Sequence, residues 1–175
     1  MSSYVKIFFI ALVVQCFYCK SDVTKQPLKV DKVVVYKAER KMMLLYKGNV
    51  VREYRVALGG NPEGHKLQEG DQKTPEGEYI IDWHNPHSSY HKSLHISYPN
   101  KADKLQARRR KVSPGGNVFI HGLGNGWGEI GKEHALNDWT LGCIAVSNEE
   151  MDEIFEAVKN GTKIFIYPNK PQTQE

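Results

Sequence analysis

Short apolar runs separated by turn residues dominate the chain. Runs of this kind, bounded by Gly, Pro, Asn or charged residues, are typical of β-strands. They predict strands at residues 33–36, 42–46, 50–58, 78–82, 94–98, 118–121 and 162–167. Between the strands, the polar stretch 59–73 and the glycine-rich stretch up to about residue 137 predict loops. The sequence Thr-Pro-Glu-Gly at 74–77 predicts a turn, because proline presets φ and glycine accepts positive φ.

Two segments have helical character. Residues 101–111 carry six basic side chains, and Ser-Pro-Gly-Gly at 113–116 ends the segment. The second helix is better defined, because Ser147 and Glu150 fit a capping box at its start and Gly161 provides an end. Its apolar residues fall at helical spacing on one face, and they are Met151, Ile154, Phe155 and Val158. With no internal repeat or interdomain linker, the pattern predicts one mainly β domain with a few helices.

Residues 1–21 differ in composition from the rest of the chain. Lys6 precedes an apolar run at 7–14, and polar residues follow, which is the pattern of a secretory signal peptide. The run is shorter than the roughly 20 apolar residues of a membrane span. We therefore expect export to the periplasm or cell envelope, with lipid or membrane anchoring through Cys16 or Cys19 as the alternative. The catalytic domain is expected at 28–169, followed by a C-terminal tail at 170–175.

Composition narrows the function classes. The chain has 175 residues, 40% hydrophobic and 25% charged, which is the balance of a folded globular domain. Its formal net charge of +4 is mild. The basic segment 101–111 has no interleaved aromatic residues, so it is interpreted as a solvated helix face, with weak attraction to anionic polymers as the alternative. We expect no nucleic-acid partner.

Cys143 is the strongest candidate for chemistry. Once the leader is removed it is the only cysteine, so it has no partner for a structural disulfide. A thiol attacks as the thiolate, and therefore needs a base or a favourable dipole nearby. Gly142 leaves room for a substrate carbonyl to lie against backbone N–H groups, including that of Cys143, which would stabilise an oxyanion.

His121, at the end of a predicted apolar strand, is the candidate base. A neutral imidazole can take the thiol proton and return it to a leaving amine. The carbonyl of the following Gly122 is expected to hold the other ring nitrogen and fix the tautomer. His134, closer to Cys143 along the chain but in a stretch without a pattern, is the competing base.

Four motifs in order resemble the YkuD-like family of L,D-transpeptidases. They are Lys73-Thr74-Pro75-Glu76-Gly77, Ser113-Pro114-Gly115-Gly116, Ile120-His121-Gly122 and Thr140-x-Gly142-Cys143-Ile144. The resemblance covers roughly residues 30–168. It implies a β-sandwich of mixed sheets with a few flanking helices, a nucleophile at Cys143, a base at His121 and a supporting carbonyl at Gly122.

The same resemblance implies an activity in cell-wall biogenesis and cell shape. The thiolate would attack a peptidoglycan tetrapeptide stem, often after a third-position diaminopimelate. D-alanine would leave, and a thioester would pass the acyl group to an amine of another stem or of an envelope protein. Carbapenems are the inhibitors expected. Leu141 and Ala145 depart from the His and Arg or Asn common in the family. The segment 138–140 is similar to the YafK-like branch, so hydrolysis of peptidoglycan links is the alternative outcome, and a non-catalytic wall-binding module is a third.

Substrate contacts are expected from residues around the predicted cleft, namely Tyr98, His95, Trp127, Trp139 and Thr140. A different class of site is suggested by the spacing of four histidines, which are His84, His87, His91 and His95. On one helical face they would bind zinc. Pro86 and the serines at 88 and 89 instead favour a loop, and no carboxylate or cysteine completes the set. We therefore expect neither a metal nor a cofactor.

Overall fold

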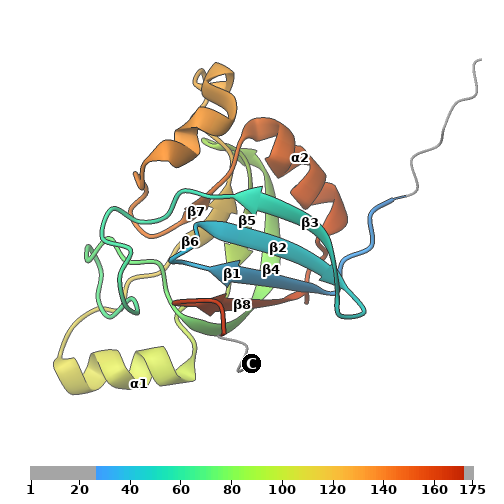
Figure 1. Cartoon of the computed structure of the whole chain (residues 1–175). Coiled ribbons are helices and arrows are strands. Elements are labelled where there is room, and N and C mark those ends of the chain that lie inside the picture. Colours follow the sequence, from blue (N-terminus) through green and yellow to red (C-terminus); the bar gives the residue numbers. More distant parts are fainter. Residues whose placement is uncertain (1–26, 172–175) are drawn as a thin grey trace, which may run out of the picture.

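The computed structural model describes residues 27–171 of the chain (Figure 1). The predicted leader at 1–21, with Cys16 and Cys19, and most of the predicted tail lie outside the described residues. Within residues 27–171, none of the helices combines the length and the apolar character that crossing a membrane requires.

Eight strands form one curled, mixed sheet. They are β1 (Lys32–Tyr36), β2 (Lys41–Tyr46), β3 (Asn49–Arg55), β4 (Gly77–Ser88), β5 (His91–Ile96), β6 (Val118–His121), β7 (Ile144–Ala145) and β8 (Lys163–Tyr167). Their order is β3-β2-β1-β8-β4-β5-β6-β7. The pairs β1–β8 and β6–β7 are parallel and the others antiparallel. The sheet curls so that its two halves face each other (Figure 1), and the mainly β fold with mixed strands is confirmed.

Three helical segments flank the sheet. They are α1 (Lys101–Arg110), the 3₁₀ segment η1 (Gly128–Leu136) and α2 (Asn148–Ala157). Helix α2 begins with the predicted capping box, in which the Glu150 N–H donates to Ser147 Oγ at 3.3 Å and the Ser147 N–H donates to Glu150 Oε2 at 3.1 Å. Its apolar face packs on the sheet, with Met151 and Ile154 fully buried. That face gives α2 its fixed position beside β5.

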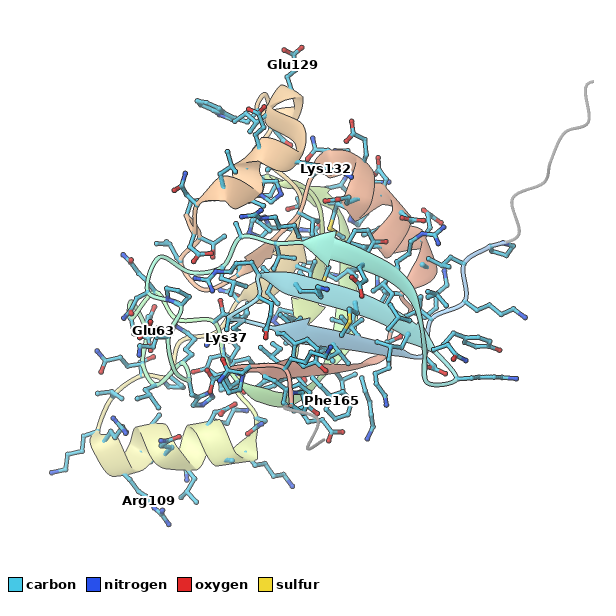
Figure 2. All side chains as sticks on the ribbon, viewed as in Figure 1. Lys37, Glu63, Arg109, Glu129, Lys132 and Phe165 are labelled. Carbon is cyan, nitrogen blue, oxygen red and sulfur yellow. The ribbon has the colours of Figure 1, made fainter. Side chains whose placement is uncertain are left out.

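Helix α1 lies at the opposite end of the molecule from η1 (Figure 1). Its basic side chains are exposed, and Arg109 points away from the body of the protein (Figure 2). The basic segment is thus a solvated helix face, and it lies apart from the end of the sheet where β6 and β7 pair.

Three local predictions were wrong. Strand β4 continues to Ser88 through the segment expected to be a loop, and its pairing with β5 shifts register between Asn85 and Ser88. This irregularity accommodates Pro86, because proline cannot donate to a regular ladder. The glycine-rich stretch contains η1, which is broken at Gly131 with φ of 54°. The third strand ends at Arg55, three residues short of its predicted end.

Lys37 fixes the long loop that follows residue 58. Its buried ammonium donates to the carbonyls of Gly64 at 2.6 Å and Thr74 at 2.9 Å, and to Glu76 Oε1 at 2.8 Å. Figure 2 shows Lys37 beside the loop that carries Glu63. Burial lowers the Lys37 pKa, while the Glu76 carboxylate opposes that shift. Because a buried charge with fixed partners is costly to displace, the loop is held against the end of β1.

Candidate active site

The parallel pairing of β6 with β7 brings the candidate base and nucleophile together. His121 is opposite Ala145 in this pair, and Ile120 is opposite Ile144. Cys143 directly precedes β7, so this pairing also brings it to the end of the sheet that carries His121. Both residues line one cleft of about 440 Å³. Two residues that are distant along the chain therefore share a single site.

His121 is held as a neutral imidazole. The side chain is only 5% exposed, and its Nδ1–H donates to the Gly122 carbonyl at 2.7 Å, as expected from the sequence. A carbonyl accepts only, so this bond fixes the proton on Nδ1 and leaves Nε2 as an acceptor. Burial lowers the pKa of His121 to about 4; the Gly122 carbonyl opposes that shift, and His134 adds to it. At neutral pH the ring can therefore receive a proton.

Gly122 itself cannot be replaced without a clash. A Cβ at this position would stand 2.7 Å from Asn148 Oδ1 and 3.0 Å from the Cβ of His91. The Asn148 amide oxygen also accepts the N–H of Leu123 at 2.8 Å. The first residue of α2 thus packs tightly against Gly122, whose carbonyl orients His121.

The thiol of Cys143 is protonated at rest. Its Sγ lies 3.7 Å from the Asn117 carbonyl oxygen. Burial raises the pKa of the thiol, and the backbone amide of Phe119 and the ammonium of Lys66 partly offset that rise. With an imidazole that resists protonation and a thiol that resists ionisation, the resting pair is neutral. The proton would cross only as the sulfur attacks a carbonyl.

A tight turn presents the thiol. Thr140 Oγ1 donates to the Cys143 carbonyl at 2.8 Å and accepts the N–H of Gly142 at 3.1 Å. Gly142 has φ of 129°, and a Cβ there would stand 2.7 Å from the Lys73 carbonyl oxygen. Only glycine fits this position. The N–H of Gly142 is engaged by Thr140, so among the oxyanion donors considered from the sequence the N–H of Cys143 remains.

Aromatic rings pack around the imidazole. The ring of Tyr90 lies 4.6 Å from that of His121, and the ring of Trp139 lies 5.8 Å from it, centroid to centroid. Tyr90 and Trp139 stack on each other at 6.3 Å. Both line the cleft, and both are partly exposed, which leaves aromatic surface for a ligand. Tyr90 was not predicted, because it lies in the turn between β4 and β5, far from any motif.

The structure separates the residues expected to contact substrate. Trp139 and Thr140 line the cleft with Cys143, whereas Trp127 lines a neighbouring hollow of about 480 Å³. Tyr98 is 3% exposed and belongs to the core, where its hydroxyl donates to the Pro114 carbonyl at 3.0 Å. His95 pairs with Asp82 at 2.6 Å and is not among the residues that line the cleft.

His134, the competing base, is buried in η1. Neither ring nitrogen has a hydrogen-bond partner among residues 27–171, and burial lowers the pKa of this histidine. The ring lines the neighbouring hollow with Trp127, and it does not line the cleft that holds Cys143. The geometry therefore favours His121 over His134 as the base.

Three of the four histidines considered for zinc have separate hydrogen-bond partners. His84 bonds Asn160 and the Val158 carbonyl, His91 bonds Asp152, and His95 bonds Asp82. In the part of the chain that the structure describes, no three His, Cys, Asp or Glu side chains come together in a way that could hold a metal ion.

The two positions that depart from the family pattern have opposite environments. Leu141 is 76% exposed at the mouth of the cleft. Ala145 is fully buried, and it exchanges backbone hydrogen bonds with Ala57 at 3.0 and 2.9 Å. The packing around Ala145 fills the space that a long polar side chain would need. Ala145 therefore offers no polar group to a substrate. Among residues 27–171, Lys66 in the long loop is the cation whose charge lowers the pKa of the Cys143 thiol.

The chain thus combines a curled mixed sheet with a thiol, an imidazole and a backbone carbonyl gathered at the β6–β7 end. Residues 31–166 match the family described as YkuD, the L,D-transpeptidase catalytic domain. The chain belongs to this family.

Individual relatives are more distant. The chain is 27% identical over 143 residues to YafK of Escherichia coli strain K12, whose name assigns it provisionally to the L,D-transpeptidases; the match covers 78% of this chain and 50% of YafK. The helical cell shape determining protein Pgp2 of Campylobacter jejuni has the same fold, with a TM-score of 0.64 and 24% identity over 81% of this chain and 49% of Pgp2. An L,D-transpeptidase of Xylanimonas cellulosilytica aligns with a TM-score of 0.52 and 16% identity, covering 81% and 62%. The chain thus spans about half the length of YafK and Pgp2.

Proposed function

We propose that this protein is an exported peptidoglycan L,D-transpeptidase that works through a thioester on Cys143. One observation supports the proposal above the others: His121, with its Nδ1 proton held by the Gly122 carbonyl, lines the same cleft as the Cys143 thiol. Family membership supports the substrate class, because the YkuD domain is an L,D-transpeptidase catalytic domain.

The reaction begins at the amide between the third stem residue and the terminal D-alanine. As Sγ of Cys143 bonds to the carbonyl carbon, the thiol proton passes to Nε2 of His121, and the backbone N–H of Cys143 stabilises the oxyanion. Collapse of this intermediate breaks the C–N bond. The imidazolium gives its proton to the departing nitrogen, so D-alanine leaves with a free amine and the stem remains as a thioester.

An amine then attacks the thioester carbonyl, and the new amide forms as the C–S bond breaks. His121 takes the proton from the attacking nitrogen and returns it to sulfur. The amine belongs to a second stem or to an envelope protein, and water in its place gives hydrolysis.

The test is incubation of the full chain with purified tetrapeptide muropeptides, followed by measurement of D-alanine release and of dimers. We expect D-alanine release with new cross-linked dimers from the wild type and none from Cys143→Ala. Release without dimers, or loss of existing links, would assign the hydrolytic outcome instead. Normal turnover by Cys143→Ala would refute the proposal.

Two controls sharpen this test. Lys104→Ala changes an exposed position on α1, and this variant should match the wild type. Circular dichroism of Cys143→Ala should show an unchanged fold. A carbapenem should add its mass to the wild-type protein and leave Cys143→Ala unmodified, which locates the reactive group by mass spectrometry.

The leader supports the proposed location. A positive residue, an apolar run and a polar boundary at 1–21 are the pattern of an exported protein, and peptidoglycan lies outside the cytoplasm. Fractionation of cells that express the full chain should place it in the envelope or periplasm, and removal of residues 1–21 should retain it in the cytoplasm.

A further inference from the structure

The neighbouring hollow, which Trp127 lines, adjoins the cleft that holds Cys143. Its volume is about 480 Å³, and it shares Ser89, Tyr90 and Trp139 with the cleft. Trp127, directly before η1, lines this hollow and does not line the cleft. A substrate bound at Cys143 can therefore extend past the stacked rings of Tyr90 and Trp139 into a second space.

The rings that line this hollow leave a large part of their surface uncovered. Trp127 is 66% exposed, Tyr90 43% and Trp139 39%. A Cβ added at Gly124 would stand 3.5 Å from Cδ1 of Trp127 and 3.9 Å from Cε1 of Tyr90, so the missing side chain of this glycine leaves room between the two rings. Aromatic surface around a hollow of this size is characteristic of a ligand site.

Each of the three rings also carries a polar group without a protein partner. The indole N–H groups of Trp127 and Trp139 and the hydroxyl of Tyr90 form no hydrogen bond with another residue in the range 27–171. The hydroxyl of Ser89 in the same lining is also unpaired within that range. The hollow thus presents apolar ring faces together with neutral hydrogen-bonding groups at their edges.

His134 adds an unsatisfied polar side chain to the wall. It is 7% exposed, and both ring nitrogens lack a hydrogen-bond partner among residues 27–171. Its ring meets that of Trp139 edge-on, at 6.4 Å between centroids. A buried polar group without a partner is unusual in a folded protein. A hydroxyl, which both donates and accepts, is the kind of partner that a neutral imidazole lacks here.

The lining of the hollow is uncharged. Within residues 27–171, the side chains that line it include no Asp, Glu, Lys or Arg, and burial lowers the pKa of His134, which keeps its ring neutral at pH 7. The charged residues of η1 are directed elsewhere, since Glu129 points away from the body of the protein (Figure 2) and Lys132 pairs with Glu150 at 3.5 Å. A carboxylate that entered the hollow would lose water without gaining a counter-ion.

These properties select one part of peptidoglycan. Its stem peptides carry carboxylates, whereas its sugars are uncharged rings with apolar C–H faces and hydroxyl edges. Sugar C–H groups can lie on the electron-rich face of an aromatic ring, and sugar hydroxyls can pair with indole N–H and phenol groups. We propose that the neighbouring hollow binds a sugar ring of the wall glycan, stacked on Trp127, with its hydroxyls toward Tyr90 and Ser89.

The length of a stem peptide agrees with this arrangement. Three stem residues separate the sugar from the carbonyl that Cys143 attacks, and an extended chain of three residues spans roughly 10 Å. The two spaces share the rings of Tyr90 and Trp139, so a single stem can connect them. The choice of peptidoglycan as the polymer rests on the proposed function, whereas the binding of an uncharged sugar does not.

The first experiment measures binding without any reaction. The full chain is titrated with a trimer of N-acetylglucosamine, and the affinity is obtained by calorimetry. Trp127→Ala should bind the trimer about tenfold more weakly, the effect of one lost ring contact, and Trp127→Phe should recover part of the loss. Trp83→Ala is the matched control, because Trp83 is 52% exposed on β4 and lines neither space. No saturable binding by the wild type, or equal affinity in Trp127→Ala, would overturn the proposal.

Two further comparisons test the shape and the neutrality of the site. Gly124→Leu keeps all three rings but fills the room between Trp127 and Tyr90, so it should abolish binding of the trimer. A uronic-acid trimer, which carries carboxylates, should bind the wild type at least about tenfold more weakly than the neutral trimer, because the lining offers it no cation. Equal binding of the two trimers would contradict an uncharged site.

A second experiment asks whether the sugar contributes to turnover. It compares kcat/KM for D-alanine release from a free tetrapeptide and from the same tetrapeptide attached to its disaccharide. The wild type should prefer the disaccharide form several-fold, and Trp127→Ala should bring the ratio of the two values close to one. Equal slowing of both substrates by Trp127→Ala would show that this tryptophan supports the cleft and does not bind sugar.

The two experiments separate this proposal from the proposed function. If the wild type released D-alanine from neither substrate, the proposed function would fail, and the calorimetry would still decide whether the hollow binds a sugar. If D-alanine were released without sugar binding and without a preference for the disaccharide, only the sugar site would be refuted. Circular dichroism of Trp127→Ala and Gly124→Leu should match that of the wild type, and either variant alone can carry the binding test.

Discussion

A single hydroxyl joins Thr140 to Cys143: its Oγ1 donates to the Cys143 carbonyl at 2.8 Å while accepting the Gly142 N–H at 3.1 Å. Thr140→Val keeps the shape and removes both bonds. We expect a loss of about 1–2 kcal/mol in the free energy of unfolding and a roughly tenfold lower rate of D-alanine release. Thr140→Ser retains the hydroxyl and should recover most of both. Valine and serine variants of equal activity would show that the hydroxyl does not hold the turn.

The backbone at Gly142 leaves no space for a side chain. Gly142→Ala would combine positive φ with a Cβ 2.7 Å from the Lys73 carbonyl oxygen. Gly126 also has positive φ, at 92°, but a Cβ there meets nothing within 4 Å. Gly126→Ala should therefore cost about 1 kcal/mol of strain and Gly142→Ala at least about 3 kcal/mol, measured by urea denaturation. An equal loss of unfolding free energy in the two variants would mean that the loop containing Lys73 moves to make room for the methyl group.

The burial of His121 makes stability depend on pH. Its pKa in the folded protein is about 4, below its ordinary value of 6.5. Between these values the unfolded chain binds a proton that the folded protein does not, so the stabilisation is fully present above pH 6.5 and is lost as pH falls through 4. The loss approaches about 3 kcal/mol for this group. Denaturation curves of His121→Gln should show a smaller decrease between pH 7 and pH 4 than those of the wild type.

The neutral resting pair predicts the reactivity of Cys143. Because burial raises the pKa of the thiol, alkylation by iodoacetamide should accelerate only above the ordinary range of a cysteine. The alkylation rate should not change sharply near neutral pH, since the His121 ring is already uncharged there. A plateau of fast alkylation that begins near pH 5 would instead indicate a preformed thiolate and imidazolium.

Asp138 links the segment before Cys143 to the first half of the sheet. Its carboxylate pairs with Arg40, at 2.6 Å from Nη2 and 2.9 Å from Nε, and accepts the N–H of Leu58 at 2.9 Å. Asp138→Ala leaves a half-buried guanidinium unpaired, and should cost about 3 kcal/mol. The exposed pair of Lys41 and Glu53 is the control, and Glu53→Ala should cost less than about 0.5 kcal/mol. Thermal unfolding of both variants tests this difference.

Most of the fold could be predicted because its elements carry local signals. Alternating apolar runs indicated seven of the eight strands, and the capping box with its apolar face indicated α2. Strand β7, with two residues, is too short to have a pattern of its own. The extension of β4 past Pro86 depends on pairing with β5, which a single stretch of sequence does not encode.

The candidate site also has residues that local sequence indicates and residues that only the folded chain brings together. The positions of Cys143, His121 and Gly122 could be predicted because short motifs carry them. Two other residues near Cys143 are placed by tertiary contacts alone. Tyr90 contacts His121 from the turn between β4 and β5, and Lys66 lies beside Gly142 in the long loop after residue 58. Tyr98, expected near the substrate, instead fills the core, because its position on an apolar strand end reads equally well as buried or exposed.

The central position of β8 has a consequence for how the sheet is assembled. Within residues 27–171 this strand follows the other seven along the chain, yet it pairs with β1 on one side and β4 on the other. Until residues 163–167 emerge, the chain can hold only two separate ribbons with exposed edges. The pairing that unites them therefore forms only after all seven other strands have been synthesised, and each half of the sheet keeps an exposed edge until then.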